Sequence, residues 1–211
     1  MPHDDLDIEP VLGLPETPPE GESILWQGAP LAWPLAKRAL NVHWVAAYFG
    51  ALALWRGVDT AGEGGLREGL IAAFWYVLIG AVAVGVLSLI AWAMARATVY
   101  TITTHRVAMR IGAALTVTLN LPFRWIGSAD LAVHRDGTGT ILLNLTGETR
   151  LSYLVVWPHV KPWAISRTVP ALRCIPEPEK VGRILADAAA TRVSRLDAQS
   201  GARDADPVAA E

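Results

Sequence analysis

Twenty-six consecutive residues between Leu70 and Ala95 carry no charged side chain. At a rise of 1.5 Å per residue, a helix of this length is about 39 Å long, whereas the hydrocarbon core of a bilayer is about 30 Å thick. Trp75 and Trp92 lie toward its two ends, at the interfacial depth that aromatic side chains prefer. A soluble helix would carry polar residues on its outer face. The sequence therefore predicts a membrane protein with a transmembrane helix over residues 70–96.

A second uncharged segment of seventeen residues runs from Ala39 to Trp55. Its length is near the lower limit for a membrane-spanning helix, and we predict a first transmembrane helix over residues 36–56. The connection 57–69 is short and rich in glycine, as expected between two antiparallel membrane helices.

Basic residues are distributed unequally around the two predicted spans. Five lie on the side of the termini and two at or in the connection: Lys37, Arg38, Arg96, Arg106 and Arg110 against Arg56 and Arg67. Positively charged flanks tend to remain in the cytoplasm. We therefore expect a multi-pass protein of the inner (cytoplasmic or intracytoplasmic) membrane with both termini in the cytoplasm.

The two ends of the chain are expected to lack fixed structure. Residues 1–22 are acidic and rich in proline, which predicts a flexible tail, and residues 197–211 are small and polar, which predicts a disordered tail. The net charge of −2 argues against a nucleic-acid partner. The single cysteine, Cys174, cannot form an intramolecular disulfide.

Beyond the second span the hydrophobic period changes to two, which indicates β-strands. The pattern predicts six strands after the membrane segment and one before it, the last at residues 23–27; the six lie at about 99–103, 106–111, 115–121, 128–134, 140–145 and 150–157. Asp136-Gly137 predicts a hairpin turn. From Glu179 the apolar residues recur at helical spacing, which predicts a helix.

Seven strands followed by one amphipathic helix is the element order of a pleckstrin-homology-like (PH-like) barrel. The expected fold class is thus membrane α plus all-β: a two-helix transmembrane hairpin inserted into a PH-like barrel of about seven strands, capped by the C-terminal helix. Residues 23–30 would supply the first strand, and residues 98–195 the rest of the domain with its helix. A sheet with one apolar face needs such a cover.

Several motifs support a family resemblance. YTITTHRVAMRIG (residues 100–112) resembles the signature of bacterial PH-like domains. GESILWQGAP (21–30), TVTLNLPFRWIGSADL (116–131) and WPHVKPW (157–163) are similar to segments of the photosynthetic-complex assembly proteins of purple bacteria, the PuhB family. This resemblance implies a role in assembly of the photosynthetic reaction centre, with an effect on the core light-harvesting antenna.

No motif indicates catalysis. The chain has no HExxH, CxxC, GxSxG or phosphate-binding glycine loop, and its five histidines occur in five different contexts. We expect no enzymatic activity, no metal site and no resident cofactor, with one open alternative. His43 lies in the first predicted span, where an ionisable side chain is a functional hypothesis by default. With the small residue Ala39 four positions earlier, it could ligate bacteriochlorophyll; hydrogen bonding at the interface or between helices is the other interpretation.

Small residues form a stripe on both predicted spans, namely Ala46 and Gly50 on the first and Ala81 and Gly85 on the second. Such residues allow helices to approach closely. The two spans could pack on each other through them, or another chain could dock there, including a second copy.

Three arginines of the PH-like part are candidates for contact with lipid head groups: Arg106, Arg110 and Arg124. Solvated strand positions are the alternative. Trp157 and Trp163 flank the WPHVKPW loop, which could pack across the barrel, enter the head-group layer or dock a client protein.

Taken together, these features predict a non-catalytic assembly factor. Its spans and its PH-like domain would hold reaction-centre and antenna subunits, in contact with membrane lipids. The alternative is a general membrane-surface or lipid-binding adaptor that is unrelated to photosynthesis.

Overall fold

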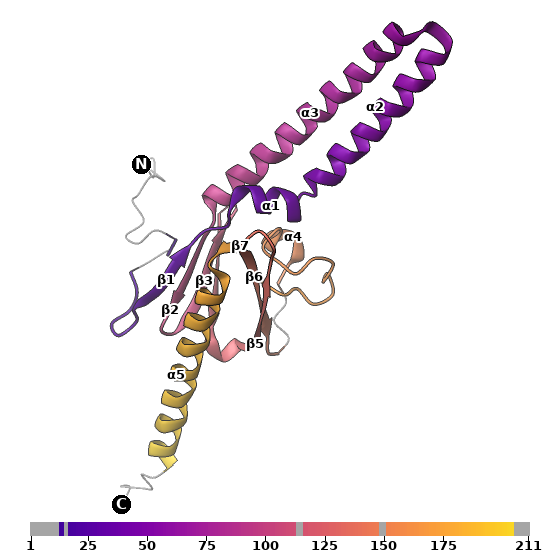
Figure 1. Cartoon of the computed structure of the whole chain (residues 1–211). Coiled ribbons are helices and arrows are strands. Elements are labelled where there is room, and N and C mark those ends of the chain that lie inside the picture. The colour runs from indigo at the N-terminus through magenta and orange to yellow at the C-terminus, as the bar shows by residue number, and fades with distance from the viewer. Residues whose placement is uncertain (1–12, 15–16, 113–115, 148–150, 205–211) are drawn as a thin grey trace, which may run out of the picture. The chain divides into compact units, whose positions relative to one another are not determined.

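The computed structural model describes residues 13–14, 17–112, 116–147 and 151–204. The chain divides into two compact units, Leu31–Arg96 and the sequence on either side of it. The first unit is helical and the second contains all the described strands (Figure 1).

Three helices make up the helical unit: α1 (Ala32–Arg38), α2 (Val42–Gly64) and α3 (Leu66–Ala97). α2 and α3 lie side by side and antiparallel, with Gly65 between them. Glycines allow the close approach, because a Cβ at Gly69 would lie 2.5 Å from the Gly57 carbonyl oxygen, and a Cβ at Gly80 would lie 2.6 Å from the Phe49 Cβ. These contacts place the packing interface on residues other than the predicted stripe of small side chains.

The helix bounds differ from the predicted spans. The chain breaks helical geometry between α1 and α2, where Asn41 has φ = 52°, so residues 36–56 are not one helix. α2 continues to Gly64 through most of the predicted connection, since extending a helix costs less than starting one. Among the described helices, α3 is the one long and apolar enough to cross a membrane. The polar second half of α2 lowers its mean hydropathy.

A four-stranded antiparallel sheet has the order β1-β2-β3-β4. Its strands are β1 (Ile24–Gly28), β2 (Val99–Thr103), β3 (Arg106–Ile111) and β4 (Val117–Pro122). The predicted β2–β3 hairpin is present, and β1 pairs with β2 across the whole helical insertion. On β4, Leu121 is buried and Val117 and Leu119 pack against the core, as the alternation predicts; Leu115 lies outside the described residues.

The second sheet is antiparallel and has the order β5-β6-β7. Its strands are β5 (Ile126–Val133), β6 (Thr138–Leu145) and β7 (Ala171–Pro176). The predicted turn at Asp136-Gly137 joins β5 to β6, with Gly137 at φ = 76° and the Asp136 carboxylate accepting from the Thr138 backbone N–H at 3.2 Å. A short 3₁₀ helix, η1 (Phe123–Trp125), separates the two sheets, which stay open and do not close into the predicted barrel.

The predicted strand over residues 150–157 is wrong. This segment holds a short helix, α4 (Tyr153–Val156), and the seventh strand is β7, fifteen residues further along. A short apolar run is ambiguous between helix and strand, and Pro158 cannot donate to a sheet ladder. Residues 148–150 lie outside the described part of the chain.

The C-terminal helix, α5 (Pro178–Asp204), covers the apolar core of the strand-containing unit. Val181, Leu185 and Ala188 are buried in the same cluster as Tyr100, Met109 and the other inward side chains of both sheets. The helix continues through residues 197–204, which corrects the prediction of disorder there; alanine, arginine and glutamine favour extension of a formed helix. Residues 205–211 lie outside the description.

The predicted flexible tail, residues 1–22, is fixed at the positions that the structure describes near its end. Leu14 is fully buried. The Glu22 side chain, 5% exposed, accepts from Arg106 Nε at 2.9 Å and from Thr103 Oγ1 at 2.6 Å. Glu22, which the sequence analysis places in a flexible acidic tail, is therefore fixed against β2 and β3.

Truncation of Leu185 tests the packing of α5. Because its side chain is buried in the core, Leu185→Ala should lower the free energy of unfolding of the strand-containing unit by about 2–5 kcal/mol. Arg183→Ala, on the exposed side of the same helix turn, should change it by less than about 0.5 kcal/mol. Urea denaturation of the full chain in detergent, followed by near-ultraviolet circular dichroism, measures both. Equal stabilities would show that α5 does not close the core.

Candidate functional site

His43 lies in the first turn of α2 and is exposed. Its ring is 5.7 Å from that of Trp44. Ala39 belongs to the break before α2, so the two residues do not share the continuous helical face on which the pigment interpretation was based. His43 thus lies at the start of α2 and not in the middle of a continuous helix.

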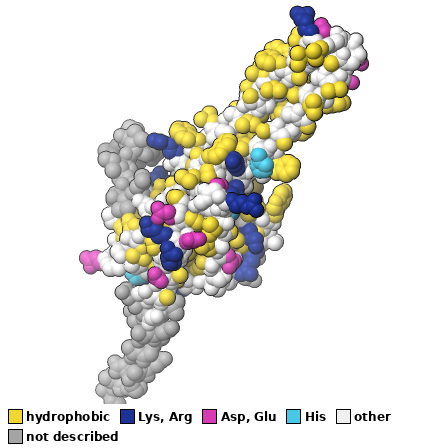
Figure 2. All heavy atoms as spheres, in the orientation of Figure 1, with side chains coloured by type: hydrophobic (Ala, Val, Ile, Leu, Met, Phe, Trp, Pro, Cys, Tyr) yellow, Lys and Arg dark blue, Asp and Glu magenta, His cyan; other side chains and the backbone are white. Residues whose placement is uncertain are grey.

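The small residues of the predicted stripe are all exposed on the helical unit: Ala46, Gly50, Ala81 and Gly85. The first three line a shallow groove of about 300 Å³ between α2 and α3. A Cβ added at Gly50 or Gly85 would meet no atom within 4 Å. The stripe therefore lies beside the interface between α2 and α3 and leaves space for another helix. Figure 2 shows hydrophobic side chains along this unit, with charged ones gathered at its far tip.

The three candidate arginines lie at two different ends of the four-stranded sheet. Arg110 pairs with Val99, at the end where β2 begins after α3. Arg106 pairs with Pro122 at the other end, and Arg124 follows Pro122 in η1. Four residues of strand separate Arg106 from Arg110 by about 13 Å. The three candidate arginines therefore do not lie together at one end of the sheet.

A basic pocket of about 260 Å³ forms at the end that holds Arg106. The ionisable side chains that line it belong to Arg106, Arg124, Arg192, His105 and Glu22. Glu22 pairs with Arg106, and the guanidinium carbon of Arg124 lies 5.8 Å from the centre of the Trp125 ring. Two of the three arginines in the pocket, Arg106 and Arg124, thus already interact with other side chains of the protein.

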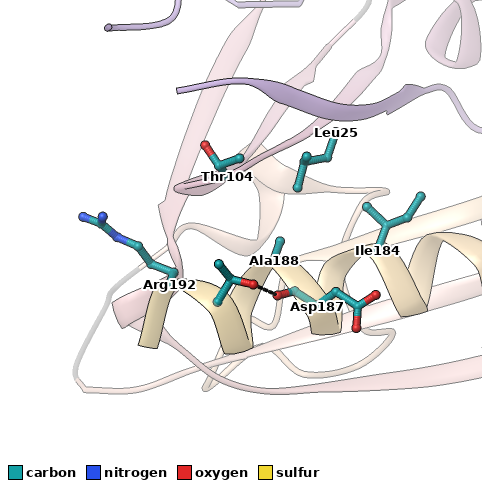
Figure 3. A pocket seen from close by; sticks show the side chains of 7 residues that line it. Leu25, Thr104, Ile184, Asp187, Ala188 and Arg192 are labelled. Atoms are coloured by element: carbon teal, nitrogen blue, oxygen red, sulfur yellow. Dashed lines mark hydrogen bonds between the residues drawn. The ribbon is translucent and has the colours of Figure 1, made fainter. Parts of the chain in front are cut away.

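Two further grooves run along α5. One, of about 410 Å³, lies between α5 and the β1 side of the sheet; Figure 3 shows Leu25 and Ile184 facing it, with Thr104 and Arg192 toward one end. The other, of about 550 Å³, lies between α5 and β5 and includes Phe123, Ile126 and Leu131. Both grooves are mainly apolar.

The tryptophans of the WPHVKPW loop have different surroundings. Trp157 packs against the core, whereas Trp163 is 89% exposed with φ = 64°. The two side chains therefore do not act together at one surface.

His159, between them, is the centre of a buried polar network that the sequence analysis did not identify. Its Nδ1 lies 2.5 Å from the Tyr100 hydroxyl, and its Nε2 lies 3.2 Å from Thr98 Oγ1. The Arg173 backbone N–H donates to the same Tyr100 oxygen at 3.3 Å, and the Arg173 side chain donates to the Pro158 carbonyl at 3.0 Å. The WPHVKPW motif was the available signal, but spacing alone does not show which histidine is buried.

Burial sets the protonation of this network. It lowers the pKa of His159 to about 3, with a smaller contribution from the Arg173 charge, and it raises the pKa of Tyr100. Since the Tyr100 oxygen accepts from Arg173, we assign its proton to the bond with Nδ1. The neutral imidazole then carries its own proton on Nε2 and donates to Thr98. The network ties the loop to β2 and β7, and both its imidazole and its phenol are neutral.

The described residues contain no group of three or more His, Cys, Asp or Glu side chains arranged to hold a metal ion. Cys174 is buried.

The depressed pKa of His159 predicts a pH dependence of stability. The folded state keeps the imidazole neutral down to about pH 3, whereas the unfolded chain protonates it near its ordinary pKa of 6.5. The contribution of His159 to the free energy of unfolding is therefore fully present above pH 6.5 and declines as the pH falls toward 3. In that range the slope of the free energy of unfolding against pH approaches the value for one additional proton bound by the unfolded chain. Urea denaturation of the full chain between about pH 7.5 and about pH 4.5 measures the slope, because this range extends roughly one pH unit above and two below the ordinary pKa of histidine. In His159→Gln that part of the slope should vanish; an unchanged slope would contradict the assignment.

Comparison with known proteins agrees with this architecture. Residues 45–189 match the family model described as bacterial PH domain. The chain is 47% identical over 192 residues, 90% of each sequence, to a Rhodobacter capsulatus protein described as an uncharacterized 23.7 kDa protein in the puhA 5′ region. No solved structure gives a significant match.

The family match covers well over half of the chain, and the relative is aligned over nearly all of it. The residues of the family match include the motifs at residues 100–112 and 157–163. The chain therefore belongs to the bacterial PH domain family, as a PuhB-like protein.

Proposed function

We propose that this protein is a non-catalytic assembly factor of the bacterial inner membrane, acting on the photosynthetic reaction centre and its core light-harvesting antenna. The observation that carries the proposal is the 47% identity, over nine-tenths of the chain, to a protein in the puhA 5′ region. This supports a role related to photosynthesis. Assembly as the specific role comes from the resemblance to the PuhB family.

In this proposal both long helices cross the membrane. α3 has 32 residues, about 48 Å of helix, which exceeds the thickness of a hydrocarbon core. α2 has 23 residues and would place its polar last third in the head-group layer, where Arg56 pairs with Asp59 at 2.7 Å. The excess of basic residues beside α1 and after α3 supports cytoplasmic termini.

The client contacts follow from the exposed surfaces. Gly50 and Gly85 leave space beside the α2–α3 interface, where a transmembrane helix of a reaction-centre or antenna subunit, or of a second copy, could approach closely. The apolar grooves beside α5 would receive a cytoplasmic segment of the same client. Holding both parts of one subunit is the scaffolding role.

Topology can be tested with a reporter that is active only in the periplasm. A fusion inserted at Gly65, between α2 and α3, should be active, and a fusion at Glu211 should be inactive. Activity at Glu211 would contradict the two-span arrangement and the cytoplasmic location of the PH-like unit.

The assembly role predicts the phenotype of a deletion strain. Assembled reaction centre, measured by absorption of isolated membranes, should fall well beyond any change in the transcripts of its subunits. Because a scaffold acts during assembly, complexes formed before depletion should decay at their normal rate. Normal reaction-centre levels in the deletion strain would reject the assembly role and favour the general membrane-surface adaptor.

His43→Leu in the same strain tests the pigment interpretation, because leucine suits the bilayer but neither ligates magnesium nor forms a hydrogen bond. Loss of assembly at normal levels of the variant protein would favour a polar or pigment contact at His43. Normal assembly of the reaction centre in the His43→Leu strain would show that His43 is only a solvated residue at the start of α2.

A further inference from the structure

Four large apolar side chains are exposed within twelve residues of the strand-containing unit. Leu154 and Val155 on α4 are 84% and 53% exposed, and Trp163 and Ile165 in the following loop are 89% and 67% exposed. We call these four residues the apolar rim. Single exposed apolar residues are ordinary on protein surfaces, but a cluster of this kind marks an interaction site.

The segment that carries the apolar rim has a fixed base. The His159 backbone N–H donates to the Val156 carbonyl at 2.8 Å, which ties the segment to α4. Beyond it, Val160 and Pro170 form an antiparallel bridge, and the Lys161 N–H donates to the Val169 carbonyl at 2.9 Å. The rim is therefore presented by two closed turns and not by a loose strand.

This base is attached at the end of the unit from which the chain continues into α3. His159 Nε2 contacts Thr98, the residue directly after the last residue of α3, and His159 Nδ1 contacts Tyr100 near the start of β2. Figure 1 shows α4 at this same end of the sheets. A single buried side chain, that of His159, therefore connects the segment that carries the apolar rim to Thr98, where the chain leaves α3.

The charge of the segment suits an anionic surface. From Leu151 to Pro176 the sequence has no Asp or Glu, and it has three Lys or Arg residues. Two of them, Lys161 and Arg167, are exposed and lie within two residues of Trp163 or Ile165 in sequence; one Arg167 guanidinium nitrogen donates to the Leu145 carbonyl at 2.8 Å. Apolar side chains with basic neighbours are the pattern of segments that lie in the head-group layer, where tryptophan is especially favoured.

We propose that the apolar rim inserts into the head-group layer of the membrane that α3 enters, with Lys161 and Arg167 facing lipid phosphates. This makes the rim a second anchor, which sets the orientation of the PH-like unit on the bilayer. Covalent attachment to α3 keeps the rim near the surface, so that a weak individual affinity suffices for stable contact. The inference rests on the proposed membrane location of α3.

The test uses the full chain in liposomes of phosphatidylcholine and phosphatidylglycerol, without any client protein. Because Cys174 is buried, a thiol-reactive label added to the folded protein attaches to the introduced surface cysteine. The chain without an introduced cysteine measures the background labelling. Leu154→Cys and Ile165→Cys carry an environment-sensitive fluorophore, and lipids with a spin label near the head group act as the quencher. Ser194→Cys, exposed on the second half of α5, is the matched control, and Val86→Cys in α3 reports on the span.

Labels at residues 154 and 165 should show blue-shifted emission and at least roughly twice the quenching of the label at 194, since interfacial insertion removes them from water. Adding Trp163→Asp should reduce the quenching at residue 154. If the label at 86 is quenched by lipids spin-labelled deep in the acyl chain, but those at 154 and 165 behave like 194, the rim is not a membrane anchor and the proposed span stands. If the label at 86 is not quenched, the proposed span itself fails. Rim labels that change only after client subunits are added would assign the rim to protein docking and overturn the proposal.

Discussion

Pairing between β1 and β2 connects parts of the chain that are separated by the entire helical unit. The Ser23 backbone N–H donates to Thr104 Oγ1 at 3.2 Å, across 81 positions of sequence. Gly28 pairs with Tyr100, so the chain leaves the sheet and returns to it at the same end. An antiparallel pair of helices is suited to this arrangement, because it returns the chain to its starting point and limits the conformational cost of closing so long a loop. Without β1 the sheet would expose the edge of β2.

The second dependence is on the network around His159. A neutral imidazole, a phenol, a threonine hydroxyl and the backbone of β7 satisfy one another in a region closed to water. Buried polar groups of this kind are costly when a partner is lost, so the network specifies one position for the WPHVKPW segment. That position separates the roles of the two tryptophans: Trp157 completes the core and Trp163 remains at the surface.

These two constraints organise the surfaces on which the proposed function depends. The pairing of β1 with β2 places the end of β1 and the start of β2, where the chain enters and leaves the helical unit, at one end of the sheet, together with Arg110. The network around His159 places α4 and the apolar rim at that end as well. The basic pocket with Arg106 and Arg124 lies at the opposite end. Under the proposed function, one end of the PH-like unit would face the membrane and the grooves beside α5 would receive a client.

Periodicity and turn chemistry were sufficient to predict most elements. The uncharged run before Ala95 predicts α3, the alternation after Arg96 predicts β2 to β6, and the spacing from Val181 predicts the buried face of α5. These features are local, because each depends on side chains within a few residues of one another. The motifs in residues 100–112 and 157–163 likewise led to the family, which the comparison shows.

Tertiary structure decided the features that depend on distant partners. The predicted strand over residues 150–157 was wrong, because the next strand that pairs with β6 is β7 and residues 153–156 form α4. Arg106 and Arg110 look equivalent in sequence, but the register of β3 sends them to opposite ends of the sheet. Glu22 belongs to an acidic tail by composition and to a partly buried ion pair with Arg106 by geometry. The sequence determined which segments are apolar and how they alternate; which polar side chains are buried depended on neighbours up to 84 positions away, because only the folded chain brings such partners within hydrogen-bonding distance.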